Sequence, residues 1–221
     1  MDFFSGSATT AHAVMNMNSD GGTRKYIMVQ LPEDLDEAYM HASPKNKASL
    51  KNTIKFLDLH NKPHYISELG KIRITNVLDQ LQNVLKDTGF RVLKLDSTNM
   101  KDVYYNPHDV QMSILDNLES NIKEDRTPED LLFQVMLDLG VLLSSKIEES
   151  AIAGKKVFNV ADNFLIACFD EDVSDETITA VAKLQPAYFV MRDSSMKNDS
   201  VATNFDQIFA TYSPDTVRKV I

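Results

Sequence analysis

The sequence predicts an α/β fold, and three observations support this prediction. A short apolar segment, a glycine turn, a helical pattern and a second apolar segment follow one another within residues 3–30, which is the order of a βαβ unit. Three strand-like segments separated by short turns occupy residues 146–169, as in a β-meander. Hydrophobic residues make up 43% and charged residues 25% of the 221 residues, which is ordinary for a globular protein with a buried core.

The first part, residues 1–105, is expected to contain at least three parallel strands. Phe3 and Phe4 end the first strand, residues 25–30 (KYIMVQ) form the second, and residues 90–95 (FRVLKL) form the third.

Helices connect these strands. The segment from Thr9 to Met17 reads as a helix because Ala11, Val14 and Met15 fall on one side of it. Apolar spacing predicts three more helices before the third strand: a short one within residues 32–44, one near residues 50–59, and a long one over residues 66–86 with Gly89 at its C-cap position.

The second part, residues 106–221, is expected to be a small mixed α/β domain. Thr127 and Pro128 start a helix that Gly140 ends, since Thr is a good N-cap and Pro suits the first turn. The remaining predicted elements are helices at 108–122, 175–184 and 199–212 and strands at 146–152, 155–160, 164–169, 186–193 and 217–221.

Charge and cysteine content restrict the function. The net charge of −9 argues against this chain alone gripping a nucleic-acid backbone, which requires clustered Lys and Arg. The single cysteine, Cys168, allows neither a disulfide framework nor a cysteine-based metal site, and it fits the reducing cytoplasm. No apolar stretch reaches the roughly 20 residues of a membrane span, and no secretory leader is recognisable, so we expect a cytoplasmic protein without membrane contact.

The glycine turn before the first helix is the best candidate for a binding site. A strand that ends at a glycine and leads into a helix presents free backbone N–H groups at the positive end of the helix dipole. These groups suit an anionic ligand or a nucleoside derivative. Gly6, Ala8 and Ala11 form only a degenerate version of the dinucleotide-binding G-x-G-x-x-G pattern.

The amino-acid sequence around this turn resembles that of a particular protein family. DFFSGSATTAHAV followed by RKYIMVQLPE is similar to the cofactor motif and second strand of β-class DNA amino-methyltransferases, and more narrowly to the modification (Mod) subunit of type III restriction–modification systems. The resemblance continues through GFRVLKLDSTN and IEESAIAGKKVFNVADNFLIACF to the final PAYFVMRDSSMKNDSVATNFDQIFATYSPDTVRKVI. It implies a partial Rossmann-like S-adenosylmethionine methyltransferase sheet, followed by a small mixed α/β C-terminal domain.

The resemblance also implies the binding residues. The family's glycine loop holds the methionine part of S-adenosylmethionine, and Ala8 replaces its usual second glycine. The matching residues are Asp2, Phe4, Ser5, Gly6, Ser7, Ala8, Thr9 and Thr10. Either Gln30 or Glu33 would contact the cofactor ribose, and residues 96–99 would approach the adenine ring.

No catalytic residue is assigned. The family's D-P-P-Y loop, which holds the extruded adenine, has no counterpart in the 221 residues, and YYNPHD at residues 104–109 is expected to be an ordinary loop. The parent enzyme would methylate adenine in a short DNA site. It would contact DNA through the part that is missing here, bind the restriction (Res) subunit and form a Mod homodimer. The chain then reads as a C-terminal part truncated at the cofactor motif, and by itself it is expected not to methylate DNA.

Two other functions are compatible with the sequence. The region from about residue 108 could be an interaction module for Mod dimerisation or Res docking, and a nicotinamide-dependent oxidoreductase ranks last because the glycine pattern is incomplete. Four smaller features are interpreted structurally: His60 and His64 as surface histidines, residues 193–195 as a helix-entry loop, residues 170–172 as a solvated turn, and Met15, Met17 and Met28 as core.

Overall fold

The structure is a computed structural model that describes residues 1–101, 121–196 and 199–221. The described residues have a mixed α/β fold with seven α-helices and one open five-stranded sheet. The chain divides into two compact units, residues 1–94 and 95–221, each with its own hydrophobic core.

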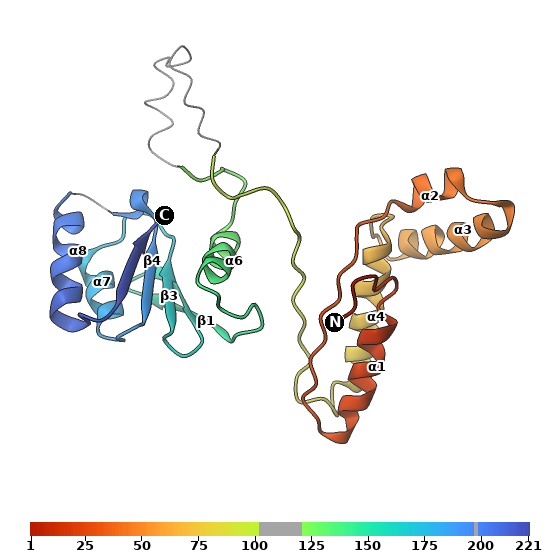
Figure 1. Cartoon of the computed structure of the whole chain (residues 1–221), viewed down its shortest axis with the longest axis horizontal. Coiled ribbons are helices and arrows are strands. Elements are labelled where there is room, and N and C mark those ends of the chain that lie inside the picture. The colour runs from red at the N-terminus through yellow and green to blue at the C-terminus, as the bar shows by residue number, and fades with distance from the viewer. Residues whose placement is uncertain (102–120, 197–198) are drawn as a thin grey trace, which may run out of the picture. The chain divides into compact units, whose positions relative to one another are not determined.

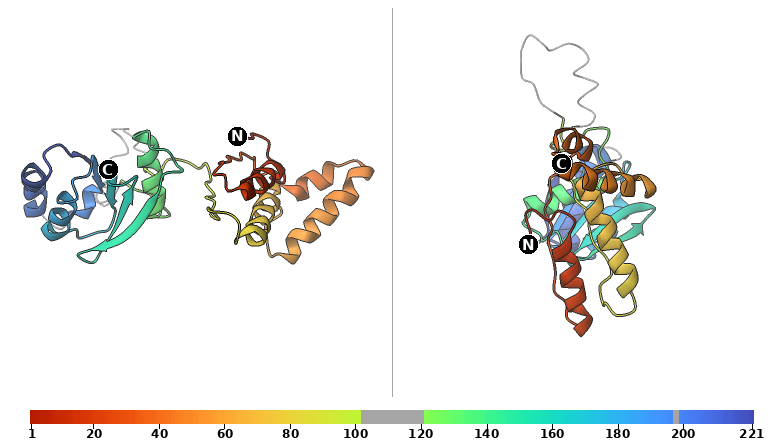
Figure 2. Two further views of the ribbon diagram at one scale, coloured as in Figure 1. Left: turned by 90° about the horizontal axis from the view of Figure 1, so that it is seen from below. Right: turned by 90° about the vertical axis from the view of Figure 1, so that its right-hand side faces the viewer.

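Unit 1, residues 1–94, is helical. Its helices are α1 (Thr9–Met17), α2 (Leu35–His41), α3 (Pro44–Leu59) and α4 (Ile66–Leu81). Helices α1 and α4 lie side by side in both drawings and share an apolar core that includes Ala11, Met15, Ile74 and Val77 (Figures 1 and 2). A second cluster of Leu35, Leu57 and Ile72 fixes α2 and α3 against the start of α4. These four helices confirm the predicted ones.

The three parallel strands predicted for the first part do not form. Residues 1–94 contain no β-strand, and the expected pairing is reduced to one isolated parallel bridge between Asp2 and Met28. Residues 90–95 also form no β-strand. A parallel strand depends on neighbours in the same sheet, and a two-stranded pair is marginal alone.

The end of α4 also differs from the prediction. The helix ends at Leu81 instead of Lys86, and a turn closed by Val84 N–H to the Leu81 carbonyl at 2.8 Å follows it. Gly89 is therefore not its C-cap. The apolar stripe of the helix continues through Leu81 and Leu85, but Asn83 between them is a poor helix former.

Unit 2, residues 95–221, contains the sheet in the order β1-β2-β3-β4-β5. Strands β1 (Ile147–Ile152), β2 (Lys155–Val160) and β3 (Leu165–Cys168) are antiparallel neighbours, which confirms the predicted meander. Strands β4 (Tyr188–Met191) and β5 (Val217–Val220) then add in parallel.

Helices cover both faces of this sheet (Figure 1). Helices α7 (Asp175–Ala182) and α8 (Asp199–Tyr212) connect the parallel strands and pack on one face through Ile178, Phe205 and Phe209. Helix α6 (Pro128–Asp138) covers the other face through Leu131, Val135 and Met136. The predicted helix at residues 108–122 falls mainly outside the described residues, as does YYNPHD.

The local signals at the ends of α6 are satisfied in the structure. Thr127 and Asp130 form a reciprocal capping box, with the Thr127 backbone N–H donating to Asp130 Oδ2 at 2.8 Å. At the other end, Gly140 has φ +68°, and the Val141 N–H donates to the Met136 carbonyl at 2.8 Å. These two features are a Schellman motif, which needs the left-handed glycine that the sequence supplies.

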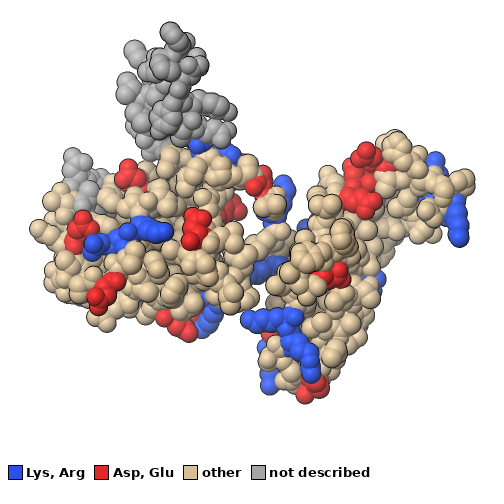
Figure 3. All heavy atoms as spheres, in the orientation of Figure 1, with Lys and Arg blue, Asp and Glu red and all other residues tan. Residues whose placement is uncertain are grey.

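The distribution of surface charge and the length of the helices can be compared with the predictions made from net charge and hydropathy. On the face of unit 2 drawn in Figure 3, acidic and basic side chains occur side by side, and no broad basic surface is visible there. None of the helices in the described part of the chain is long and apolar enough to cross a membrane.

Candidate functional site

The candidate site is the loop of residues 2–8 that leads into α1. Its backbone is tied to the segment that follows α1. Asp2 N–H donates to the Ile27 carbonyl at 2.9 Å, Val29 N–H donates to the Asp2 carbonyl at 2.8 Å, and Ser5 N–H donates to the Val29 carbonyl at 3.2 Å. The chain therefore makes the beginning of a parallel pair before it turns into the helix.

Two residues of the loop have left-handed backbone conformations. Gly6 has φ +49°, and Ala8, the N-cap of α1, has φ 60° and ψ 38°. A glycine adopts this conformation freely, whereas for another L-residue it costs about 1–2 kcal/mol. The structure thus gives a physical reason for Gly6, and it shows that Ala8 stands where a second glycine would relieve strain.

Asp2 joins the beginning of the loop to the first turn of α1. Its carboxylate accepts a hydrogen bond from Thr10 Oγ1 at 2.6 Å and another from the Phe4 N–H at 3.2 Å. Ala8 provides no side-chain cap, and the first turn of α1 contains no acidic residue. The positive end of the helix dipole is therefore not balanced by an acidic side chain of its own first turn.

Helix α4 packs against the loop of residues 2–8, a contact that was not predicted from the sequence. A Cβ placed on the buried Gly70 would lie 3.4 Å from the Gly6 carbonyl and 3.4 Å from the Ala8 Cβ. Arg73, one turn further along α4, donates from Nη2 to Ser7 Oγ at 3.2 Å. The loop therefore has small residues, Gly6 and Ala8, where α4 packs against it. The guanidinium group of Arg73 lies next to the loop. The available signal was a glycine inside an otherwise strong helical pattern.

The structure separates the two ribose-contact candidates. Gln30 turns its side chain onto the loop, where Oε1 accepts the Gly6 N–H at 2.7 Å. Glu33 is exposed, and its backbone N–H is bonded to the Leu31 carbonyl at 2.8 Å. Gln30 therefore positions the glycine turn, and Glu33 is the carboxylate that remains at the surface near the end of this segment.

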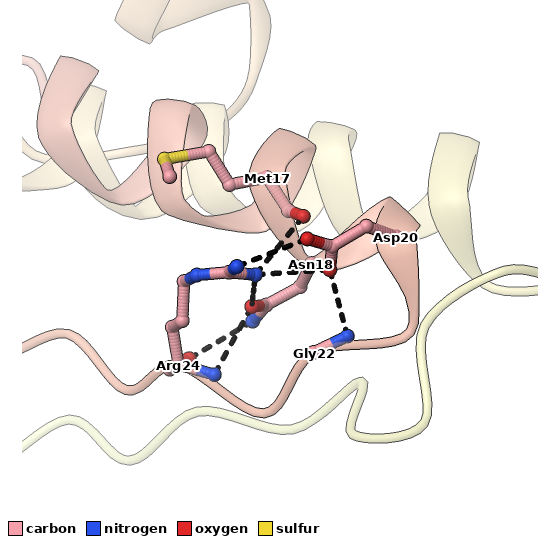
Figure 4. A network of polar contacts seen from close by, with 5 residues as sticks. All are labelled: Met17, Asn18, Asp20, Gly22 and Arg24. Atoms are coloured by element: carbon pink, nitrogen blue, oxygen red, sulfur yellow. Dashed lines mark hydrogen bonds and ion pairs between the residues drawn. The ribbon is translucent and has the colours of Figure 1, made fainter.

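A polar network closes the turn between α1 and residues 25–31 (Figure 4). Arg24 lies beside Asp20, with Nη1 to Oδ1 at 2.9 Å and Nη2 to Oδ2 at 2.9 Å, and it also donates to the Met17 carbonyl at 3.2 Å. The hydrogen bond to Arg24 lowers the pKa of the Asp20 carboxyl. This bidentate ion pair stabilises the turn after which residues 25–31 run back toward the loop of residues 2–8.

The remaining residues of the predicted site are divided between the two units. Thr9 and Thr10 are exposed on the first turn of α1, and Phe4, within the loop, is 86% exposed. Residues 96–99 belong to unit 2, where Ser97 Oγ accepts hydrogen bonds from Lys123 and Arg126, each at 3.0 Å. The structure therefore places the predicted adenine-contacting segment in a different unit from the glycine loop.

The smaller candidates are structural features in this chain. His64 lies between Asp36 and Asp58, each 2.8 Å from one of its ring nitrogens, whereas His60 packs on Phe56. The described residues contain no group of His, Cys, Asp and Glu that could hold a metal ion. Among the three methionines predicted as core, Met15 is buried and Met28 is partly buried, but Met17 is exposed. Met17, the last residue of α1, is 56% exposed, so the prediction that it belongs to the core was wrong.

The two acidic or serine-containing turns also have clear structural roles. Residues 193–195 form a short 3-10 helix between β4 and α8, in which Ser195 is buried. In the turn after β3, Asp170 accepts the Lys156 N–H at 2.6 Å.

Comparison with known proteins adds no identification: no family model matches the chain, and no curated protein matches it.

Proposed function

We propose that this chain is the cofactor-binding and C-terminal portion of a site-specific DNA adenine methyltransferase, the Mod subunit of a type III restriction–modification system. One observation carries the proposal. The resembling motif DFFSGSATT folds as an extended end, a left-handed glycine turn and a helix N-terminus, and this is the local structure that a bound nucleoside cofactor would require.

The residues of the loop fit the chemistry of S-adenosylmethionine. Arg73 and the N-terminus of α1 provide positive potential beside the turn, which suits the carboxylate of the methionine part. Gly6 leaves space above the turn, since nothing lies within 4 Å of a Cβ placed on it. Gln30 holds the turn in its conformation, and Glu33 is the surface carboxylate available to the ribose hydroxyls. Phe4 offers an exposed ring within the loop.

The first test is calorimetric titration of the full chain with S-adenosylhomocysteine, S-adenosylmethionine and NAD. We expect the first two to bind and NAD not to bind. Gly6→Val should weaken binding at least about tenfold, because a β-branched side chain strongly disfavours φ +49°. Gly21→Val is the matched control: Gly21 also has positive φ (+86°) and open space around it, but it lies at the far end of α1.

Three results would argue against the proposal. Equal binding of NAD would favour the oxidoreductase, equal losses in the Gly6 and Gly21 variants would mean that only the fold of unit 1 was affected, and no binding by a chain that circular dichroism shows to be folded would remove cofactor binding from this chain. We expect no methylation of DNA in any of these samples, because the 221 residues lack a D-P-P-Y motif.

A second function, docking of the restriction subunit, is favoured by one feature of unit 2. An open depression of about 630 Å³ lies where β4 and β5 begin, and its lining combines the apolar Phe164, Pro214 and Val217 with the polar Gln185, Ser213 and Asp215. Phe164 and Val217 are exposed there. Exposed apolar side chains that are surrounded by polar ones are typical of interaction sites. Titration of the Res subunit with the wild-type chain and Val217→Lys tests this function, and equal binding of both chains would exclude the depression as the docking site.

A further inference from the structure

Strand β5 is an open edge of the sheet in unit 2. It pairs in parallel with β4 alone, and no other strand of the described chain lies beside it. The Val217 N–H donates to the Ala187 carbonyl at 2.9 Å, on the side of β4. Because successive residues of a strand point their main-chain groups to opposite sides, those of Arg218 and Val220 point away from β4. Within the described residues no main-chain hydrogen bond reaches them, so they are available to a further strand.

The depression at the start of β4 and β5 borders this edge. Val217, the first residue of β5, lines it together with Phe164 and Tyr188, whose ring centroids lie 5.3 Å apart. Val217 is level with Tyr188 in the register of the two strands, so both side chains lie on the face of the sheet that α6 covers. On that face Val217 is 48% exposed. A strand beside β5 would therefore have an aromatic-lined depression at the level of Val217.

The charged side chains of β5 are all basic. Lys219 follows Val217 by two residues and therefore lies on the same face of the strand. It is exposed, and it has no ion-pair or hydrogen-bond partner among the residues that the structure describes. Arg218, on the opposite face, pairs with Asp206 of α8 at 3.2 Å. The edge thus presents one uncompensated positive charge, two positions away from the residue that lines the depression.

We propose that β5 binds an extended acidic segment of another protein as an additional strand, with an acidic side chain beside Lys219 and an aromatic side chain over the depression. In this mode of recognition, main-chain hydrogen bonds give affinity and pockets for alternate side chains give specificity. Asp215 in the lining repels a second acidic side chain there, so the acidic residue belongs beside Lys219. The segment runs antiparallel to β5, because antiparallel ladders are the more stable. Read from its N-terminus, it carries the acidic residue two positions before the aromatic one.

The charges argue against a second copy of this chain as the occupant. A second β5 would bring its own Arg and Lys side chains to the basic edge. Strand β1, the other edge of the sheet, carries Glu148 and Glu149, but these carboxylates already pair with Lys146 and Lys156. The inference names the chemistry of the segment for the docking function proposed at this depression, and it does not rest on the methyltransferase function.

Fluorescence polarisation with a labelled peptide and the full chain tests the proposal. The probe is a peptide of about eight residues, the length of a strand, made of Thr and Val with one Glu two positions before one Phe and with both ends blocked. We expect saturable binding between about 1 and 500 µM, because one added strand makes a small interface. Lys219→Glu should weaken binding about tenfold, since attraction becomes repulsion. Lys51→Glu is the control, because it makes the same charge change on an exposed residue of α3.

Val220→Pro tests the main-chain pairing. Proline removes the N–H that points away from β4 and leaves the bonds between β4 and β5 in place, and an edge strand tolerates proline at such a position. Circular dichroism should show an unchanged fold, and peptide binding should weaken at least about fivefold. In the wild-type chain, hydrogen exchange of the Arg218 and Val220 amides should become slower when the peptide is bound, whereas exchange along β1 should stay the same.

Three results would overturn the inference: no binding of the peptide by the folded chain, equal binding by the Lys219 and Lys51 variants, or equal binding of a peptide in which Phe precedes Glu. Titration with the Res subunit separates this inference from the docking function. If Res binds and the peptide does not, docking stands and the strand-addition mode falls. If the peptide binds and Res does not, the edge binds acidic segments but the docking function falls.

Discussion

Ala8 and Gly70 show how closely the candidate loop and α4 depend on small residues. Ala8 is almost fully buried and left-handed, and its Cβ contacts the position where a Gly70 side chain would begin. A larger residue at either position would have to move the loop away from α4. The loop conformation is therefore determined by residues on two elements that are separated by more than fifty positions in the sequence.

The protonation of His64 should make the stability of unit 1 depend on pH. The side-chain hydrogen bonds to Asp58 and then Asp36 raise the pKa of the imidazole in the folded chain above its ordinary value of 6.5. A raised folded pKa gives stability that is fully present below about pH 6.5 and is lost as the pH rises through the folded pKa. Urea unfolding of unit 1 between pH 5.5 and 8.5 should thus show falling stability.

Substitution of the histidine checks the origin of that slope. His64→Gln should flatten the decline in stability above pH 6.5, whereas His60→Gln, which changes the ring stacked on Phe56, should preserve it. If both variants retain the full slope, the Asp36–His64–Asp58 arrangement is not its cause.

Residue-level prediction succeeded where the reason was local and failed where it was not. The left-handed conformation of Gly6 follows from a glycine between an extended segment and a helix. The role of Gln30 as a clamp on the Gly6 N–H does not follow, because the two residues are 24 positions apart and meet only through the folded backbone. Arg73 was missed for the same reason, since its contact with Ser7 depends on the packing of α4 against α1.

At the scale of elements, the cap of α6 makes a measurable contribution to unit 2. Thr127→Ala removes the side-chain oxygen that accepts the Asp130 N–H and should lower the free energy of unfolding of unit 2 by about 1 kcal/mol. Ser174→Ala is the matched comparison, because Ser174 occupies the N-cap position of α7 without a capping hydrogen bond.

Chemical denaturation followed by far-ultraviolet circular dichroism measures the difference between these two variants. We expect Ser174→Ala to stay within about 0.5 kcal/mol of the wild type. Equal losses in both variants would show that the capping box of α6 has no special contribution.

The presence or absence of neighbouring strands explains why the strands of unit 2 could be predicted from the sequence and those expected in unit 1 could not. Strands β1 to β5 all find their neighbours within the described chain, so apolar patterning and turn residues were sufficient to locate them. Residues 25–30 and 90–95 have equally good strand patterns. Neither segment forms a strand, and only the isolated bridge between Asp2 and Met28 remains, because a parallel pair is marginal without further strands beside it and patterning alone cannot supply those strands.

At the scale of the whole molecule, the two units are expected to unfold as separate cooperative transitions, because each has its own core. Raising the pH above 6.5 should therefore destabilise the unit that contains His64 and leave the other transition in place. Thr127→Ala should have the complementary effect. A single transition that moves as one in both experiments would contradict this expectation.

The only cysteine of the chain lies in unit 2, so its rate of reaction with a thiol reagent reports the opening of that unit. Cys168 lies at the end of β3 with no exposed surface, and burial raises the pKa of its thiol, so the native chain should react with a thiol reagent only when unit 2 opens. Unit 1 has no thiol of its own. The rate of thiol labelling consequently measures how often unit 2 opens. It should increase in Thr127→Ala and be unchanged in His64→Gln.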